Sequence, residues 1–249
     1  MKVLAYTVSY GDRRSLKATV DSLRSKSGMW FDWAVWLGAP SPKLAQQAQS
    51  LLDEPTGIQR LETWPDNRGQ HYATASALAL ARAEGYEWLL RVDDDIIART
   101  DRWLKKMIQR LTSLKKASGS DRYQVVAAPK ITGLRNPLQP IGDVSKAEGF
   151  PCEAMDILGG GCRLHNVEFL GNFVPDLYAP MGRKDPEQIA KYVIEQEGLM
   201  VRFPDIRMAH PTDQLEKRDS EAQHHARRMG YIWCYLGAHD VSTEAVPAV

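Results

Sequence analysis

Short apolar stretches alternate with segments of helical periodicity from residue 1 to about residue 115 of the 249-residue chain. Strands are expected at 2–9, 33–37, 58–63 and immediately before Asp93, and helices at 14–24, 44–52, 72–83 and 103–114. Elements that alternate in this way pack as a mostly parallel central sheet with right-handed crossovers and with helices on its faces. The sequence therefore predicts an α/β fold with a ligand cleft at the carboxyl ends of the strands.

The sequence after residue 117 is less regular than the first part. A boundary is expected at 118–121, followed by a strand at 123–128, a proline-rich stretch, a strand interrupted by glycines at 157–164 and a helix at 186–197. A tail that is first polar and then aromatic is expected to be helical over 212–238. Long irregular stretches inside a domain are more often functional than idle, so the proline-rich stretch is a candidate functional loop.

Charge and cysteine content bear on partners and compartment. Lys and Arg number 32 against 31 Asp and Glu, so no charge excess argues for nucleic acid or an acidic partner. The three cysteines lack the paired spacing of zinc sites, which favours a reducing compartment. The apolar amino-terminal stretch is too short for a secretory signal, and no run approaches a membrane span. We expect a cytoplasmic protein without integral membrane association.

Three consecutive aspartates, 93–95, stand between an apolar strand and the apolar pair 96–97. Like charges at neighbouring positions repel one another unless a cation lies among them. Along an extended chain Asp93 and Asp95 point the same way and Asp94 points the opposite way. Two carboxylates on one side make an oxygen site suited to Mg²⁺ or Mn²⁺. The alternative is that these residues cap the following helix or lie solvated in a turn.

The order of short motifs along the chain resembles that of the large inverting family two of glycosyltransferases with the GT-A fold. The motifs are the first strand with Ser9-Tyr10, then Asn67-Arg68-Gly69, Asp93-Asp94-Asp95, Gly159-Gly160-Gly161, 169–173, Lys184-Asp185 and 204–210. The resemblance covers roughly residues 1–211. It implies a single GT-A domain over 1–249, with a nucleotide-sugar-binding half at 1–117, an acceptor and catalytic half at 122–211, and a helical tail at 212–249.

The resemblance also implies roles for the motif residues. Asp93 and Asp95 would form the DxD pair, in which Asp95 contacts a Mn²⁺ or Mg²⁺ ion and Asp93 contacts the ribose or the metal. His210 would supply a further metal ligand, although a lone histidine is more often structural. The residues implied to contact the donor are Ser9, Tyr10, Asn67, Arg68, Asp93, Asp94 and Gly160.

Structural interpretations stand beside several of these roles. The sequence 67–69 is also typical of a turn, and the glycines at 159–161 of a flexible bend. The chain departs from the family by carrying Gly11-Asp12-Arg13 where Asn-Arg is common after the first strand. Its second strand ends in Gly38-Ala39-Pro40 without the usual acidic residue, which leaves the base specificity open.

Inverting sugar transfer needs a base that takes the proton of the acceptor hydroxyl. Asp185 matches the aspartate of the family's Glu-Asp motif, with Lys184 in place of the glutamate. The sequence 185–187 is also typical of a helix amino terminus. Both interpretations can hold, because a capping carboxylate keeps a second oxygen free. Asp176 and Glu187 are the next candidates for the base.

The resemblance predicts a metal-dependent inverting glycosyltransferase with a nucleotide-diphosphate sugar, expected to be a UDP-sugar, as donor. The acceptor hydroxyl would belong to a saccharide, a protein or a hydroxymethylated DNA base. A nucleotidyltransferase would share the acidic pair and the metal, but usually has a glycine-rich basic loop after its first strand. A non-catalytic nucleotide-sugar or nucleic-acid binding module would keep the cleft without the base, and Lys184 favours that alternative.

Overall fold

The computed structural model describes residues 1–11, 15–66, 68–118, 125–132, 138–144, 149–159, 161–176 and 185–210. The predicted helical tail at 212–249 lies outside these residues. In chain order the described elements are β1 (Val3–Gly11), α1 (Leu16–Lys26), β2 (Asp32–Pro40), α2 (Pro42–Asp53), β3 (Arg60–Trp64), α3 (Gly69–Ala83), β4 (Trp88–Val92), β5 (Ile97–Ala98), α4 (Trp103–Ser118), β6 (Val125–Thr132), β7 (Gly142–Asp143), β8 (Glu153–Met155), β9 (Cys162–Asn166), the 3-10 helix η1 (Phe169–Asn172), α6 (Asp185–Glu195) and β10 (Leu199–Ala209).

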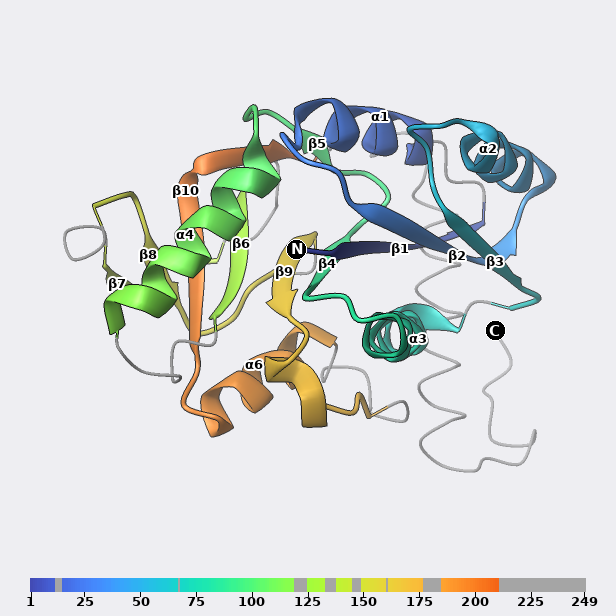
Figure 1. The fold of residues 1–249 in the computed structure, drawn as a ribbon. Helices are drawn as coiled ribbons and strands as arrows, with labels where there is room; N and C mark the ends of the chain where they lie inside the picture. Colours follow the sequence, from blue (N-terminus) through green and yellow to red (C-terminus); the bar gives the residue numbers. More distant parts are fainter. Residues whose placement is uncertain are drawn as a thin grey trace.

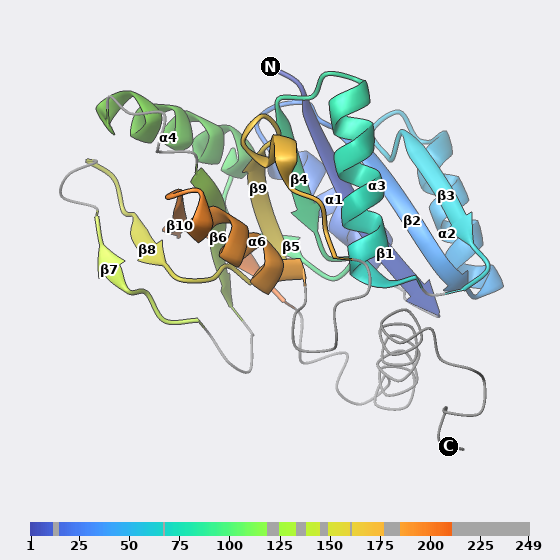
Figure 2. The ribbon, with the colours of Figure 1, turned by 90° about the horizontal axis from the view of Figure 1, so that it is seen from below.

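One sheet runs through the molecule and contains all ten described strands (Figure 1). The strand order is β3-β2-β1-β4-β9-β6-β10-β8-β7, and β5 pairs with β10 beside this path. Helices α1, α2 and α4 lie on one face of the sheet, and α3 and α6 lie on the other (Figures 1 and 2). The α/β fold with a central sheet flanked by helices is therefore confirmed.

The first part of the chain forms a parallel block. β2 pairs in parallel with β1 and β3, and β1 pairs in parallel with β4. The sequence supplies clear local signals at several boundaries. For example, the Ser41 hydroxyl accepts a hydrogen bond from the Leu44 amide at 3.2 Å, and Pro42 opens α2. These strands and helices lie within a few residues of their predicted positions.

The second part of the chain extends the sheet with pairs of both directions. β9 is antiparallel to its neighbours β4 and β6, β6 is parallel to β10, and both β8 and β5 are antiparallel to β10. The sheet is therefore mixed, with its continuous parallel block in the first part of the chain. Among the described residues of the strand expected at 157–164, only 162–164 lie in a strand, β9, which continues to Asn166. The helix expected at 186–197 is observed as α6.

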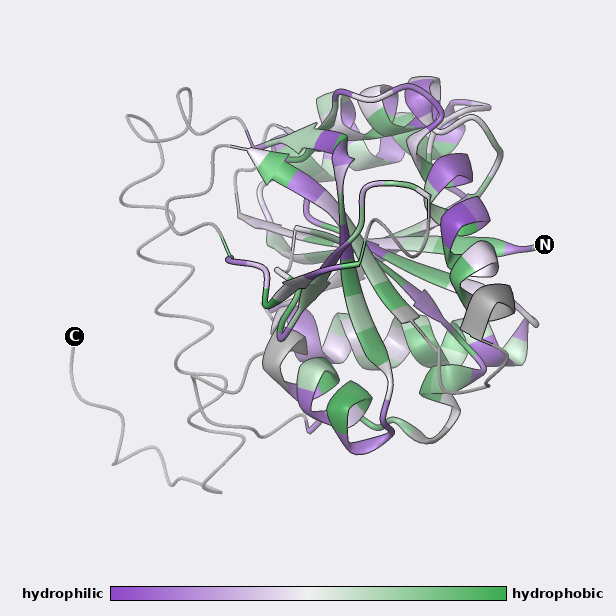
Figure 3. Cartoon of the chain, turned by 90° about the vertical axis from the view of Figure 1, so that its left-hand side faces the viewer, coloured by the Kyte–Doolittle hydropathy of each residue, from purple (hydrophilic) through white to green (hydrophobic). Residues whose placement is uncertain are grey.

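Apolar side chains fill both faces of the sheet. One core lies beneath α1, α2 and α4 and contains Trp33 and Trp103, both fully buried. The other lies beneath α3, η1 and α6 and contains Tyr6, Leu89 and Val193. Figure 3 shows hydrophobic residues along the strands and polar residues on the outer helix surfaces. Burial on both faces explains why the central strands read as continuous apolar runs.

The topology brings distant segments to one edge of the sheet. β1 and β4 are parallel neighbours, so their carboxyl ends lie together. The end of β10 pairs with β5, which closely follows the aspartate triplet, so residues 93–95 and 210 reach the same edge. Within the described ranges, no helix combines the length and the apolar character that a bilayer span requires.

Candidate functional site

Asp94 is held inside the protein by the first strand and the first helix. Ser9 Oγ, at the end of β1, donates a hydrogen bond to Asp94 Oδ2. Thr19 Oγ1 of α1 donates to the main-chain oxygen of Asp94 at 2.9 Å. Ser9 and Asp94 are both buried. The geometry gives this pair a structural role, and the predicted donor contacts of Ser9 and Asp94 would require their bond to open.

Asp93 points to the opposite face of the sheet, toward α3 and α6. Arg91 Nη2 donates to Asp93 Oδ1 at 2.8 Å, and the Asp93 amide donates to the Gly161 oxygen at 2.9 Å. Burial raises the pKa of Asp93, and the charge of Asp95 adds to this, while the charges of Arg91, Arg163 and His210 act in the opposite direction. The alternation predicted for the triplet therefore separates Asp94 from Asp93.

Asp95 meets His210 at the edge of the sheet. The Nε2 atom of His210 lies 3.0 Å from Oδ2 of Asp95. Asp95 is buried, whereas the His210 side chain is 23% exposed, so the pair is accessible from the histidine side. The His210 amide donates to the Thr132 oxygen at 2.9 Å, which fixes the end of β10 against the end of β6. The structure thus brings together two of the three predicted metal ligands, Asp95 and His210, from distant parts of the chain, while the third, Asp93, is paired with Arg91.

A carboxylate and an imidazole are suitable ligands for a divalent cation. Among the described residues, no group of three or more His, Cys, Asp or Glu is placed to hold a metal ion. Mg²⁺ and Mn²⁺ in nucleotide sites are commonly bound by one or two protein groups, with phosphate and water oxygens completing the shell. Imidazole is more compatible with Mn²⁺ than with Mg²⁺. Asp95 and His210 therefore fit an ion that is shared with a phosphate-bearing ligand.

Arg68 lies between β3 and α3, at the carboxyl end of β3. Its Nε atom donates to Asp66 Oδ1 at 3.1 Å, and its guanidinium lies 5.6 Å from the centre of the Trp64 ring. Gly69 follows with φ +74°, in the left-handed region that favours glycine. Arg68 is partly exposed at the edge of the sheet, in the connection between β3 and α3. Asn67 lies outside the described residues.

Tyr10 occupies the end of β1 beside an irregular end of β2. The β1–β2 register shifts between Tyr10 and Gly11, so that Gly11 pairs with Pro40. Ala39, which the shift passes over, has φ +42°, a left-handed conformation that is uncommon for alanine. Such irregularities are frequent beside functional sites, where they redirect the chain. Tyr10 is partly exposed at this edge, in agreement with its predicted position.

The predicted base Asp185 is the first residue of α6. The side chains of 185–187, and Lys184 as a whole, lie outside what the structure describes. Gln188, one turn further along, accepts a hydrogen bond from the Asp176 amide at 2.7 Å and donates to the Asp176 oxygen at 3.2 Å. Its amide nitrogen lies 3.5 Å from His71 Nδ1 of α3. The start of α6 is therefore tied to Asp176 and to the first part of the chain.

Two arginines of the site were missed by the sequence interpretation. Arg91 and Arg163 are 2% and 1% exposed, and they stand opposite each other on β4 and β9. An arginine within an apolar strand just before the acidic triplet is the signal that marks Arg91. Gly160, the predicted donor contact, lies outside the described residues, but its neighbour Gly161 accepts the Asp93 amide.

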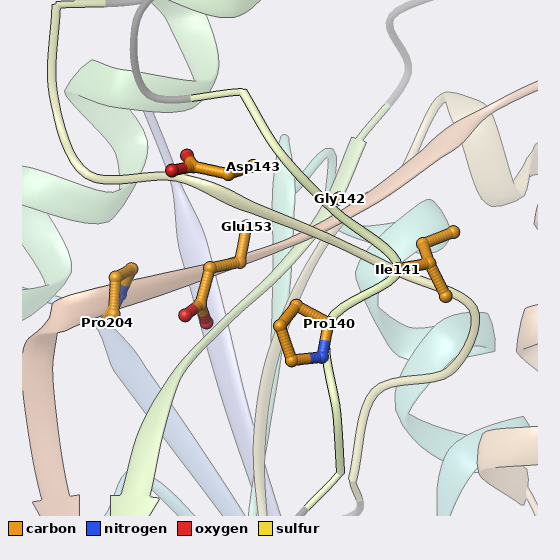
Figure 4. A pocket seen from close by; sticks show the side chains of 6 residues that line it. All are labelled: Pro140, Ile141, Gly142, Asp143, Glu153 and Pro204. Atoms are coloured by element: carbon orange, nitrogen blue, oxygen red, sulfur yellow. The ribbon is translucent and has the colours of Figure 1, made fainter.

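A separate pocket lies near the end of the sheet formed by β10, β8 and β7 (Figure 4). Its lining residues are Pro140, Ile141, Gly142, Asp143, Glu153 and Pro204. Glu153 Oε2 accepts a hydrogen bond from Arg202 Nε at 2.6 Å. The pocket lining includes neither Asp95 nor His210, and its β10 residue, Pro204, lies six residues before His210.

Comparison with known proteins identifies the fold. No protein-family model matches the sequence, and no curated protein matches it. GalNAc-T7, solved with UDP, GalNAc and Mn²⁺, is similar in structure at a TM-score of 0.62 and 13% identity, over 84% of this chain and 43% of that one. The mannosyltransferase PcManGT from Pyrobaculum calidifontis, solved with GDP-Man and Mn²⁺, is similar at a TM-score of 0.59 and 13% identity, over 97% of this chain and 65% of that one. TarS from S. aureus is similar at a TM-score of 0.57 and 14% identity, over 84% of this chain and 36% of that one.

These similarities establish that the chain has the GT-A fold, as the resemblance of its motifs predicted. At 13–14% identity the comparison defines architecture alone. This chain spans between 36% and 65% of the length of the three proteins, so their full chains contain further segments.

Proposed function

We propose that this protein is a metal-dependent glycosyltransferase that uses a nucleotide-sugar donor. The observation that carries the proposal is the meeting of Asp95 and His210 at the carboxyl edge of the sheet. Two proteins with the same fold were solved with Mn²⁺ and either UDP or GDP-mannose. The same edge carries Asp93 beside the pair, Tyr10 at the end of β1 and Arg68 after β3, which supply polar and charged groups along it.

Asp95 and His210 are the residues that would hold the cation, with Mn²⁺ favoured over Mg²⁺ by the imidazole. When bound, the cation supplies Lewis-acid stabilisation of the negative charge on the leaving diphosphate. Arg68, partly exposed and close to Asp66, supplies a positive charge at the flank of the site. Tyr10 lies where the base or ribose of the donor would contact the end of β1. A UDP-sugar is the proposed donor.

The transfer itself is proposed to invert the configuration of the sugar. Asp185 would take the proton of the acceptor hydroxyl as its oxygen attacks the anomeric carbon from the face opposite the diphosphate. Its place at the start of α6 and the link from Gln188 to Asp176 and His71 support this role, because they fix that helix relative to the donor edge. Asp176 and Glu187 are the alternatives. The acceptor is a hydroxyl of a saccharide, a protein or a hydroxymethylated DNA base.

The proposal is tested by thermal unfolding with UDP, GDP, UDP-GlcNAc and GDP-mannose, each with and without Mn²⁺. A ligand at a hundred times its Kd stabilises the native state by about 2.7 kcal/mol, which raises Tm by roughly 5–10 °C in a domain of this size. We expect a shift with one nucleotide class that requires Mn²⁺. Release of nucleoside diphosphate, and not of pyrophosphate, from the donor would then identify sugar transfer.

The variant Asp95→Ala should remain folded and lose the Mn²⁺-dependent shift. The matched control is Asp101→Ala, which removes an aspartate that is 82% exposed and contacts only Lys26, at 3.6 Å, among the described residues. It should keep the full shift. If Asp95→Ala retained the shift, Asp95 and His210 would not be the residues that hold the cation. If the wild-type protein showed no shift with any of the nucleotides, that result would contradict the proposed function.

A further inference from the structure

Arg91 and Arg163 form a buried pair of like charges beneath the site. They are directly opposed in the antiparallel register of β4 and β9, so their side chains share the sheet face toward α3 and α6. Both are almost completely buried. Guanidinium groups stay protonated even when buried, so burying two of them side by side requires acidic or polar groups in contact with them. A buried pair of this kind therefore indicates that an acidic side chain beside it needs the two positive charges.

The acidic side chain next to this pair is Asp93. Arg91 Nη2 donates to its Oδ1 at 2.8 Å, and the charge of Arg163 acts on the same carboxylate. The Arg91 side chain is 3% exposed, while that of Asp93 is 30% exposed. Of these three charged side chains, Asp93 is therefore the one that solvent or a ligand can reach, while Arg91 and Arg163 are buried. Within the described residues, only Oδ1 of its two carboxylate oxygens is hydrogen-bonded, and Oδ2 is the oxygen open to a ligand.

The main chain of Asp93 is held as well. Its amide donates to the Gly161 oxygen at 2.9 Å. A Cβ atom at residue 161 would lie 2.8 Å from Ile131 Cδ1 and 3.1 Å from Ile96 Cδ1, so glycine lets β9 begin this close to the triplet. Main chain and side chain thus restrain Asp93 independently, and its orientation is fixed before any ligand binds.

The two aspartates of the pair differ in their electrostatic surroundings. A guanidinium beside a carboxylate repels a divalent cation and cancels part of the negative charge that would attract it. Asp93 has this surrounding, whereas Asp95 faces an imidazole that is itself able to bind a cation. A neutral hydroxyl donor is not repelled in this way, and a carboxylate oriented by an arginine is a good acceptor for it.

We propose that Arg91 is a positioning residue for Asp93: it occupies Oδ1, directs Oδ2 to a ribose or sugar hydroxyl of the donor, and leaves the cation to Asp95 and His210. Arg163 reinforces the arrangement from the facing strand. This inference rests on the proposed function, in which the resemblance already assigns Asp93 to the ribose or the metal, and it adds Arg91 as the residue that orients Asp93. It predicts that changing Arg91 weakens nucleotide binding and leaves cation binding intact.

The test separates the two ligands. Mn²⁺ alone is titrated and followed by electron paramagnetic resonance, and UDP, GDP, UDP-GlcNAc and GDP-mannose are titrated calorimetrically with saturating Mn²⁺. The variants are Arg91→Lys, Asp93→Asn and the double variant, with Arg60→Lys as the matched control. Arg60 is an exposed arginine on β3 that contacts Glu84. Circular dichroism and thermal unfolding establish that each variant is folded.

We expect Arg91→Lys to bind Mn²⁺ as the wild-type protein does and to bind nucleotide about tenfold more weakly, the effect of one charge-assisted hydrogen bond. Asp93→Asn should behave in the same way, and the double variant should be no weaker than Asp93→Asn alone, because both changes remove one function. A loss confined to the two sugar nucleotides assigns the hydroxyl to the sugar, and a loss with all four assigns it to the ribose. Arg60→Lys should change neither affinity.

Two results would overturn the inference while the proposed function stands: loss of Mn²⁺ binding in Asp93→Asn, or additive losses of nucleotide affinity in the double variant. If Arg91→Lys does not fold, the Asp93→Asn titrations decide, since retained Mn²⁺ affinity with weakened nucleotide binding is the predicted pattern. A wild-type protein that binds neither Mn²⁺ nor any of the nucleotides would overturn the proposed function together with this inference.

Discussion

At the scale of single residues, the three adjacent aspartates have three different environments. Asp94 binds Ser9 beneath α1, Asp93 binds Arg91 on the opposite face, and Asp95 meets His210 at the edge. The alternation of side chains along an extended chain predicts that Asp94 points to the face opposite Asp93. The partners Ser9 and His210 could not be predicted in the same way, because they lie far from the triplet in sequence and are brought to it only by the sheet. Arg91, in contrast, is only two residues from Asp93.

Ser9 gives a prediction at this scale. Ser9→Ala removes the hydroxyl that donates to the buried Asp94 carboxylate, so it should lower the free energy of unfolding by about 1–3 kcal/mol. Mn²⁺ affinity should stay unchanged, since Asp94 points away from Asp95 and His210. Urea unfolding measures the first effect. The control Ser25→Ala removes an exposed hydroxyl of α1 and should change stability by less than about 0.5 kcal/mol. Equal effects of the two substitutions would contradict a structural role for the Ser9 bond.

At the scale of elements, β10 is shaped by an irregularity that the sequence marks only with Pro204. Phe203 pairs with Pro129 while Arg207 pairs with Lys130, so residues 204–206 bulge out of the ladder. The bulge carries Asp205 to α4, where Arg110 donates two hydrogen bonds of 2.6 Å to its carboxylate oxygens. β10 then rejoins the ladder and ends at His210. A bulge of this kind sets the direction in which the strand end points.

The contact of Arg110 with Asp205 gives a pH prediction. Hydrogen bonding from Arg110 is the main cause that lowers the pKa of Asp205 below its ordinary value. A lowered folded-state pKa contributes stability that is present above the unfolded value of about 3.9 and is lost as pH falls through the folded value. Asp205→Asn should therefore destabilise by about 1 kcal/mol or less at pH 7, a size limited by solvent screening.

The same variant should lose less stability than the wild-type protein when the pH is lowered below about 4. Urea unfolding at pH 7 and at several acidic pH values measures the difference between the two proteins. Asp101→Asn, at an exposed site, should follow the wild-type pH profile. Parallel profiles of wild type and Asp205→Asn would show that this ion pair is not linked to folding.

At the scale of the whole molecule, the two parts of the fold were predictable to different degrees. The parallel block from β1 to β4 has local signals, because β1, β2 and β3 are each followed by a helix with its own periodicity, and α2 also has a side-chain cap. The strands β5, β7 and β8 have only two or three residues and no detectable period. Their pairing is decided by contacts between distant segments. The insertion of β9 beside β4, which places Arg163 against Arg91, likewise has no local signal.

Leu164 tests whether the two parts unfold together. It is fully buried on β9 and lies opposite Leu90 of β4 and Ala127 of β6. Leu164→Ala should cost about 2–5 kcal/mol through the cavity that it leaves. Six of the seven tryptophans lie before residue 104, so tryptophan fluorescence reports mainly on the first part of the chain, whereas circular dichroism reports on all of it.

We expect the substitution to lower both unfolding midpoints equally, because β4 and β9 belong to one sheet and share one core. The surface change Ser25→Ala again serves as the control. An unchanged fluorescence midpoint with a lowered circular dichroism midpoint would divide the sheet into two independent folding units.

The central place of β4 also bears on how the protein matures. The block β3-β2-β1-β4 is built from successive strand-helix units, which a chain emerging from the ribosome can pair as soon as they are synthesised. The contact between Asp95 and His210 closes a far longer loop and must wait for β10. Chains that have made only the first block would carry the acidic triplet without the histidine and without the arginine of β9. The proposed activity is therefore tied to late folding events, since it would require the second part of the chain to have folded.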